Sequence, residues 1–394
     1  MTDVWSGVVG QPEAVEALRA AAAAAARMVE GHTPTNQAMT HAWLFTGPPG
    51  SGRSVAARSF AAALQCMAGV GCGECPGCRT TMHGTHADVR LVVPEGLSIS
   101  VAEMRALVQA AARRPTGGRW QVVIVEDADR LTEGAANALL KAVEEPPART
   151  VFLLCAPSDH PEDVSVTIRS RCRCISLRTP SAPAIAGVLT ERDGVDAETA
   201  RWAASVCGGH IGRARRLATD PAARERREAV LGIPAALRGL AEAFTCADEL
   251  VKTAEAEAST VSEERDTAER DALETAMGAG GTGKGTATAT RGARGALREL
   301  EKRQKSRATR TQRDALDLAL IDLAGFYRDV LVRTTGATVT LTHPDRSGDI
   351  GRAAAAWSPE AALHRLEAVL ACREAIESNV KPRIAIEAML TSLV

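Results

Sequence analysis

The chain has 394 residues, of which 45% are hydrophobic and 24% charged, the composition of an ordinary soluble protein with two or three folded domains. Its formal net charge of −1 excludes the large basic excess that is typical of a protein whose whole surface binds nucleic acid. No apolar run is long enough to span a membrane and the first residues lack a secretion signal, so we expect a cytoplasmic protein with no membrane partner.

The first half of the sequence alternates short apolar segments with helical patterns. We expect strands in "HAWLF", "DVRLVVP", "WQVVIV" and "TVFLLCAPS", at residues 41–45, 88–94, 120–125 and 150–158. We expect helices over residues 54–65, 99–113 and 132–147, and Ser100 with Glu103 predicts a capping box at the start of the second helix. Strands that alternate with helices predict an α/β fold with a parallel sheet covered on both faces, and a phosphate-binding loop after the first strand makes it the P-loop NTPase type.

The loop after the first expected strand, "GPPGSGRS", has the spacing of a phosphate-binding loop. Such a loop directs backbone N–H groups and a helix N-terminus at phosphates, and Gly47, Gly50 and Gly52 preserve that arrangement. Ser54 retains a hydroxyl for Mg²⁺, but Arg53 stands where lysine is usual, and a planar guanidinium does not replace a compact ammonium. We therefore expect a degenerate site at which binding of ATP and Mg²⁺ stays open.

A cluster of four cysteines in "CMAGVGCGECPGC" has the spacing of a structural zinc site, with Cys66, Cys72, Cys75 and Cys78 as ligands. The alternatives are reduced thiols, a redox pair, or a zinc-dependent nucleic-acid binder. The last is disfavoured because residues 66–82 contain a single cation. The other cysteines are expected to be small core residues: Cys155, Cys172, Cys174, Cys207, Cys246 and Cys372.

Two acids, Glu126 and Asp127, follow the strand at 120–125 in the reverse of the order found in ATP-hydrolysing enzymes. Such an enzyme places an aspartate for Mg²⁺ first and then a glutamate that orients the attacking water. An acid shortened by one methylene withdraws by about an ångström, which costs about 10²-fold in rate. We therefore expect no hydrolysis by this chain; the alternative is an ATP-hydrolysing subunit.

The segment "TIRSRCRC" follows the last expected strand and has Arg171 in its middle. An arginine outside the sheet cannot easily reach its own phosphate loop, but it can reach the γ-phosphate of a neighbouring subunit. The alternative is a basic, solvated turn.

The second half of the sequence is helical, with short helices over 181–222 and long ones over 235–277 and 295–333. We expect two exceptions, a flexible tract at 278–292 and a loop at 334–349. The tract contains a second glycine-lysine match to a phosphate loop, which we reject because no strand precedes it.

The end of the first long helix is acidic and the second is basic, which predicts an antiparallel helical hairpin. A disordered charged linker and an arm that contacts DNA phosphates are the alternatives.

The order of "GPPGSGRS", the four cysteines, "NALLKAVEEPP", "RSRC" and "GRARRL" resembles the clamp-loader branch of the AAA+ ATPases. Within that branch the chain is most similar to the family of delta-prime subunits of bacterial DNA polymerase III. The segments "VVGQPEAVEALRAA" and "NVKPRIAIEAML" resemble the first and last helices of that family. Specific motifs cover residues 4–222, and the remainder has a weaker helical likeness.

The resemblance implies a RecA-like AAA+ domain over 1–180 with a zinc module at 66–78, an all-α lid over 181–222, and an all-α collar over 223–394 with an insertion at about 255–310. It implies a stator subunit in a hetero-pentamer with motor and delta-type subunits, which loads the sliding clamp onto primed DNA as part of the DNA polymerase III holoenzyme. Arg171 would be an arginine finger acting in trans, and Arg213 matches the lid arginine of the nucleotide site.

Overall fold

The computed structural model describes residues 3–32, 38–117, 119–276 and 286–394. By their contacts these residues form two compact units, Met1–Ala218 and Thr219–Val394. No helix in the described ranges is long and apolar enough to cross a membrane.

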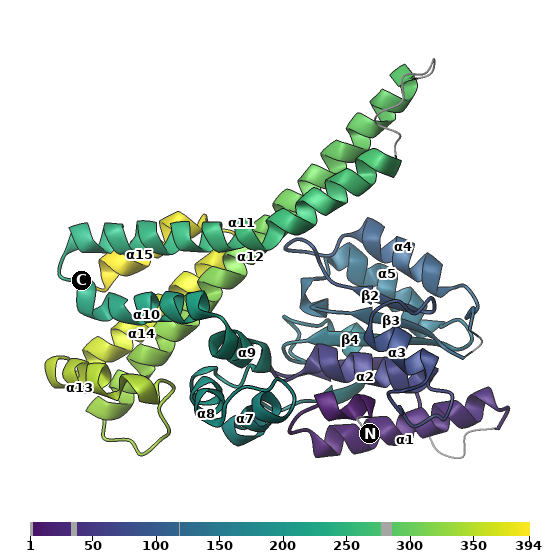
Figure 1. The fold of residues 1–394 in the computed structure, drawn as a ribbon, viewed down its shortest axis with the longest axis horizontal. Coiled ribbons are helices and arrows are strands. Elements are labelled where there is room, and N and C mark those ends of the chain that lie inside the picture. Colours follow the sequence, from purple (N-terminus) through teal and green to yellow (C-terminus); the bar gives the residue numbers. More distant parts are fainter. Residues whose placement is uncertain (1–2, 33–37, 118, 277–285) are drawn as a thin grey trace. The chain divides into compact units, whose positions relative to one another are not determined.

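The first unit is built on a five-stranded parallel sheet with the order β2-β3-β4-β1-β5 (Figure 1). The strands are β1 Ala42–Thr46, β2 Val89–Val92, β3 Gln121–Val125, β4 Thr150–Ala156 and β5 Arg173–Ser176. The first four match expected strands, so the parallel α/β fold is confirmed. We did not predict β5, because only one of its four residues is buried and it has no apolar run.

Helices cover both faces of the sheet, as expected. They are α1 Pro12–Val29, α2 Arg53–Gln65, α3 Pro76–Met82, α4 Val101–Ala111, α5 Glu133–Glu144 and the short α6 Val166–Arg169. Alternate residues of β1 point to opposite faces, so Trp43 packs with α1 and α2 while Leu44 packs with α4 and α5. The capping box of Ser100 and Glu103 is present at the start of α4.

Three short helices end the first unit: α7 Ala182–Glu191, α8 Ala197–Val206 and α9 Ile211–Thr219. α7 packs on α8. Ile185 and Ala200 are fully buried. This is the region that the sequence assigns to a lid, and its exact limits stay a prediction.

The second unit is all-helical, as expected. It contains α10 Pro221–Ala236, α11 Leu240–Ala276, α12 Thr286–Thr334, the 3₁₀ turn η3 Pro344–Arg346, α13 Ser347–Ala356, α14 Pro359–Glu377 and α15 Pro382–Ser392. Its core lies between α11, α12, α14 and α15, with Tyr327 of α12 fully buried. Because α13 starts at Ser347, the expected loop over 334–349 was drawn too long.

The helices α11 and α12 form the expected antiparallel hairpin, seen in Figure 1 as the projecting pair. Arg307 of α12 bonds Asp266 and Glu269 of α11, at 2.5 and 2.7 Å. Nearer the core, Gln312 bonds Glu255 at 3.2 Å. Residues later in α12 contact residues earlier in α11, so the two helices are antiparallel. The disordered-linker alternative is therefore wrong for the described part of the hairpin.

Three boundaries in this region differ from expectation. The flexible tract over 278–292 was drawn too long, because α12 begins at Thr286; residues 278–285 lie outside the described residues. The first long helix begins at Leu240, after a break at 237–239. Cys174 is exposed on the edge strand β5, so its assignment to the core was wrong, whereas Cys155, Cys207 and Cys372 are buried as expected.

Candidate functional site

The glycine-rich loop connects β1 to α2 and keeps the backbone shape of a phosphate-binding loop. Gly47, Gly50 and Gly52 have φ angles of 151°, 87° and 90°, which residues with side chains rarely adopt. A Cβ atom on Gly50 would lie 2.6 Å from the Cα of His210, and one on Gly47 would lie 2.6 Å from the hydroxyl of Ser51. Close packing on both sides of the loop therefore requires glycine at these two positions.

The backbone N–H groups in the first turn of α2 are not capped by a side chain. Gly52 is the N-cap and makes no side-chain bond, so the first N–H groups of the helix have no side-chain acceptor there. Arg53 follows at the first helical position, and its buried Nη1 has no hydrogen-bond partner. An uncapped helix start beside an unsatisfied guanidinium fits a phosphate group.

The acid directly after β3 is neutralised by the chain's own α2. Arg58 donates to a carboxylate oxygen of Glu126 at 3.0 Å, and the Glu126 side chain is only 15% exposed. Asp127 follows in a left-handed conformation, with φ at 51°, and opens the 3₁₀ turn η2 Ala128–Arg130. Sequence reasoning missed Arg58, although its place on the helix after the loop could have indicated it.

Burial near the loop also affects a neighbouring acid. Asp129 lies in the turn η2, and burial raises its pKa; the nearby Asp127 carboxylate adds to this and Arg53 opposes it. One Asp129 oxygen is buried without a hydrogen-bond partner. Unsatisfied polar atoms of both signs therefore lie around the loop, as expected where a charged ligand and its cation bind.

His210, the residue before α9, lies against the loop at Gly50. The Nδ1 atom of His210 accepts a hydrogen bond from the backbone N–H of Arg213 at 3.2 Å. Burial lowers the pKa of His210, and the nearby Arg213 and Arg53 lower it further, so the imidazole is neutral at physiological pH. The structure thus brings the two expected arginines near the same histidine, which sequence reasoning did not find.

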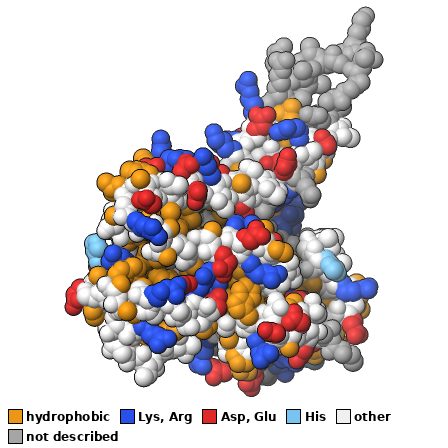
Figure 2. Space-filling model, turned by 60° about the vertical axis from the view of Figure 1, so that its left-hand side comes forward, with side chains coloured by type: hydrophobic (Ala, Val, Ile, Leu, Met, Phe, Trp, Pro, Cys, Tyr) orange, Lys and Arg blue, Asp and Glu red, His pale blue; other side chains and the backbone are white. Residues whose placement is uncertain are grey.

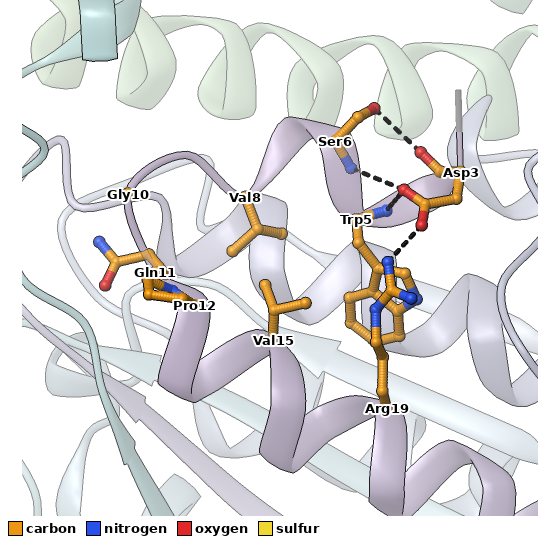
Figure 3. A pocket seen from close by; sticks show the side chains of 9 residues that line it. All are labelled: Asp3, Trp5, Ser6, Val8, Gly10, Gln11, Pro12, Val15 and Arg19. Carbon is orange, nitrogen blue, oxygen red and sulfur yellow. Dashed lines mark hydrogen bonds and ion pairs between the residues drawn. The ribbon is translucent and has the colours of Figure 1, made fainter. Parts of the chain in front are cut away.

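A pocket of about 330 Å³ is formed by the segment before α1 and by the first turns of that helix (Figure 3). Its lining is Asp3, Trp5, Ser6, Val8, Gly10, Gln11, Pro12, Val15 and Arg19. Arg19 lies over the Trp5 ring and pairs with Asp3. Gln11 connects the pocket to the loop, because its Nε2 contacts the carbonyl of Ser51 at 3.4 Å.

The four expected cysteines converge around one point. Their Sγ atoms all lie within 4.8 Å of one another, and those of Cys66 and Cys72 are 3.7 Å apart. Four sulfurs at about 2.3 Å from a tetrahedral ion would be about 3.8 Å apart, so the cluster has the size of a metal site. Gly77 brings α3 against the end of α2, because a Cβ there would overlap the Gln65 carbonyl.

Backbone N–H groups surround the sulfurs. The N–H of Cys75 points to the sulfur of Cys72 at 3.4 Å, and that of Cys78 points to the sulfur of Cys75 at 3.4 Å. Burial opposes ionisation of Cys66, but bonds from the backbone of residues 68–72 outweigh it and lower the Cys66 pKa to about 6. Burial raises the pKa of the Cys78 thiol, so the pKa values of the four thiols do not all shift one way. The convergence of the four sulfurs is what fits a closed metal site, which binds thiolates.

Arg171 follows β4, the last expected strand, but it is not beyond the final strand of the sheet, because the unexpected β5 comes after it. Its guanidinium pairs with Glu144 at the end of α5, at 2.7 Å, and donates to the carbonyl of Thr167 at 3.0 Å. The side chain is 37% exposed.

Comparison with known proteins identifies the family. Two family models match: "DNA polymerase III, delta subunit" over residues 24–181 and "DNA polymerase III, delta subunit, C terminal" over residues 312–394. The delta' subunit of Bacillus subtilis is 34% identical over 157 residues, covering 39% of this chain and 47% of that protein. The delta' subunit of Pseudomonas aeruginosa is 34% identical over 207 residues, covering 50% and 62%.

The tau subunit of Bacillus subtilis is 33% identical over 162 residues, covering 40% of this chain and 28% of that protein. The chain thus spans between about a quarter and three fifths of these relatives' lengths. Both family models, over residues 24–181 and 312–394, describe the DNA polymerase III delta subunit, in agreement with the named relatives. These matches support a clamp-loader-family protein.

Proposed function

We propose that this chain is the delta-prime, or stator, subunit of a DNA polymerase III clamp loader. In this role it joins motor and delta-type subunits in a hetero-pentamer that loads the sliding clamp onto primed DNA. Its RecA-like domain, lid and collar would be residues 1–180, 181–222 and 223–394. The two delta-subunit family models and the delta' relatives support this assignment.

The ion pair between Arg58 and Glu126 is the observation that carries the proposal. An ATP-hydrolysing site needs its first acid for Mg²⁺ and its second for water. Here the first is held by a cation of the same chain, and the second is the shorter Asp127. We infer a chain that does not hydrolyse ATP. Nucleotide binding itself is supported by the uncapped start of α2 and by the unsatisfied Nη1 of Arg53.

Arg171 is the residue that we propose acts on a neighbouring subunit. To reach another subunit's γ-phosphate, Arg171 must break its ion pair with Glu144. Both side chains are partly exposed, and such a pair contributes about 0–1 kcal/mol to stability. An arginine finger accelerates hydrolysis by about 10³- to 10⁵-fold, which corresponds to about 4–7 kcal/mol of transition-state stabilisation. The exchange of partners therefore costs much less than the arginine contributes at the neighbouring site.

The test is Arg171→Ala in a reconstituted clamp loader, with DNA-stimulated ATP turnover as the measurement. We expect normal assembly on a sizing column and loss of turnover at the one site that the arginine serves, by about 10³-fold or more. The matched control is Arg169→Ala, which removes a similar cation paired with Asp159 at 2.8 Å. Turnover that is the same in wild-type, Arg171→Ala and Arg169→Ala complexes would overturn the role.

The second candidate is an ATP-hydrolysing motor subunit of the same family. The retained glycine loop and the similarity to a tau subunit favour it. Steady-state turnover of the purified chain separates the two, and we expect little or none. Arg53→Lys alone should not restore turnover, because Glu126 remains paired with Arg58. Turnover at the level of a motor subunit in either protein would replace our proposal with this one.

We further propose that the cysteine cluster (Cys66, Cys72, Cys75 and Cys78) holds a structural Zn²⁺. A bound zinc would supply a covalent-strength link between the end of α2 and α3. With four thiolates there is no position for a substrate or water, so no catalytic step is assigned to it. The sulfur separations of 3.7 and 4.0 Å support the size of the site.

A further inference from the structure

Cations of α12 lie on different faces of the helix. Arg307 points to α11 and bonds Asp266 and Glu269, and its side chain is only 12% exposed. Arg298, Lys302 and Lys305 are exposed, and among the described residues their side chains have no hydrogen-bond or ion-pair partner.

These three residues form one row. At about 100° per residue, the positions 298, 302 and 305 lie within about 60° of each other around the helix axis. Arg307 lies about 180° from Arg298, which agrees with its contacts to α11. We call Arg298, Lys302 and Lys305 the basic row. In the sequence Arg291 and Arg294 continue the same spacing, but their side chains lie outside the described residues.

Acidic residues flank the basic row on both sides. Glu299 and Glu301 are exposed and lie about 60° to 100° around the helix from Arg298, in opposite directions. Figure 2 shows acidic and basic side chains together on the hairpin below its grey end, so the hairpin is not uniformly basic. A narrow row of cations between acids fits a line of negative charge better than a broad anionic surface such as a membrane.

The spacing along the helix matches a nucleic-acid backbone. Successive cations of the basic row are about 6 and 4.5 Å apart along the axis, given the rise of about 1.5 Å per residue. One strand of duplex DNA presents a charge about every 3.4 Å of axis. A cation therefore meets roughly every first or second phosphate, and the packing of α12 on α11 keeps the row straight.

We propose that the basic row on α12 binds the phosphate backbone of duplex DNA. This goes beyond the proposed function, because the hairpin belongs to the second unit, whereas the glycine-rich loop, Arg171 and the cysteine cluster belong to the first. The contacts are to phosphates, so binding is independent of base sequence and depends strongly on salt.

The test measures binding of the full chain to a short fluorescent DNA duplex by anisotropy at several salt concentrations. The variant is Arg298→Ala/Lys302→Ala/Lys305→Ala. The matched control is Arg265→Ala/Arg270→Ala/Arg303→Ala, which removes three exposed cations from other faces of the same hairpin. Circular dichroism confirms that both variants remain helical.

Each phosphate contact contributes about 0.9 to the slope of log affinity against log salt, so the loss of three contacts reduces the slope by about 2.7. Between about 50 and 200 mM salt, the wild-type chain should therefore lose about 40-fold more affinity than the basic-row variant. The control variant should change this slope by less than about 0.9, the value for one phosphate contact. An unchanged slope in the basic-row variant, an equal change in the control, or tighter binding to single-stranded DNA or anionic phosphatidylserine vesicles than to the duplex would overturn the proposal.

Discussion

Replacing Arg307 with alanine should loosen the α11–α12 hairpin without unfolding the rest of the chain. Arg307 makes three short contacts with Asp266 and Glu269, at 2.5, 2.7 and 3.1 Å, and is the most enclosed cation of the hairpin for which an ion pair is described. Its removal leaves two carboxylates together on one turn of α11.

The magnitude follows from the pKa of Glu269. The bond from Arg307 is the main cause that lowers this pKa from 4.5 to about 2; burial opposes the shift and Arg265 adds to it. A shift of this size corresponds to about 3 kcal/mol at most. The Glu269 side chain is 27% exposed, so solvent screening reduces this. We expect a loss of about 1–2 kcal/mol in the local stability of the hairpin.

The sign of the pH dependence follows from the same shift. The pKa of Glu269 is lower in the folded state, so the stabilisation is complete above about pH 4.5, the ordinary value, and disappears as the pH falls towards about 2. Wild-type chain and Arg307→Ala should therefore differ at pH 7 and converge in strong acid.

Hydrogen exchange with mass spectrometry measures this directly. Amides in 262–276 and 298–312 should exchange about 5- to 30-fold faster in Arg307→Ala at pH 7. The control is Arg298→Ala, which removes an exposed arginine from the opposite face and should leave exchange unchanged. Equal exchange in wild type and Arg307→Ala would refute the reasoning, as would equal acceleration in the control.

Two further predictions concern the first unit. Removal of metal by a chelator should lower its thermal midpoint by several degrees, since a loss of 1 kcal/mol shifts a unit of this size by about 2–4 °C; metal analysis below about half an equivalent of zinc in purified protein would contradict the assignment of the cysteine cluster. Gly50→Ala should destabilise the loop by about 1–3 kcal/mol and weaken binding of a fluorescent ATP analogue, because its Cβ meets the backbone of His210. Gly31→Ala is the control, since Gly31 has the same φ but nothing within 4 Å of the added carbon; an equal effect of both changes on analogue binding would contradict the role of the close approach.

Elements whose signals are local could be predicted from the sequence. β3 and β4 are buried throughout and apolar after their first residues, because helices cover both faces of the sheet, so a continuous apolar run marks each of them. The capping box of Ser100 and Glu103 depends on residues three apart, and the structure has it as predicted. The hairpin followed from long helical segments of opposite charge.

The surroundings of the glycine-rich loop and of the sheet edge could not be predicted from the sequence, because they depend on tertiary packing. The edge strand β5 has no apolar run, because it pairs on one side alone and three of its four residues are exposed. Arg58 and Glu126 are 68 residues apart, and they meet because α2 packs against the sheet where β3 ends. His210 lies against Gly50 across a still longer stretch of chain. Spacing along the sequence carries no signal for such contacts, since they depend on how separate elements pack.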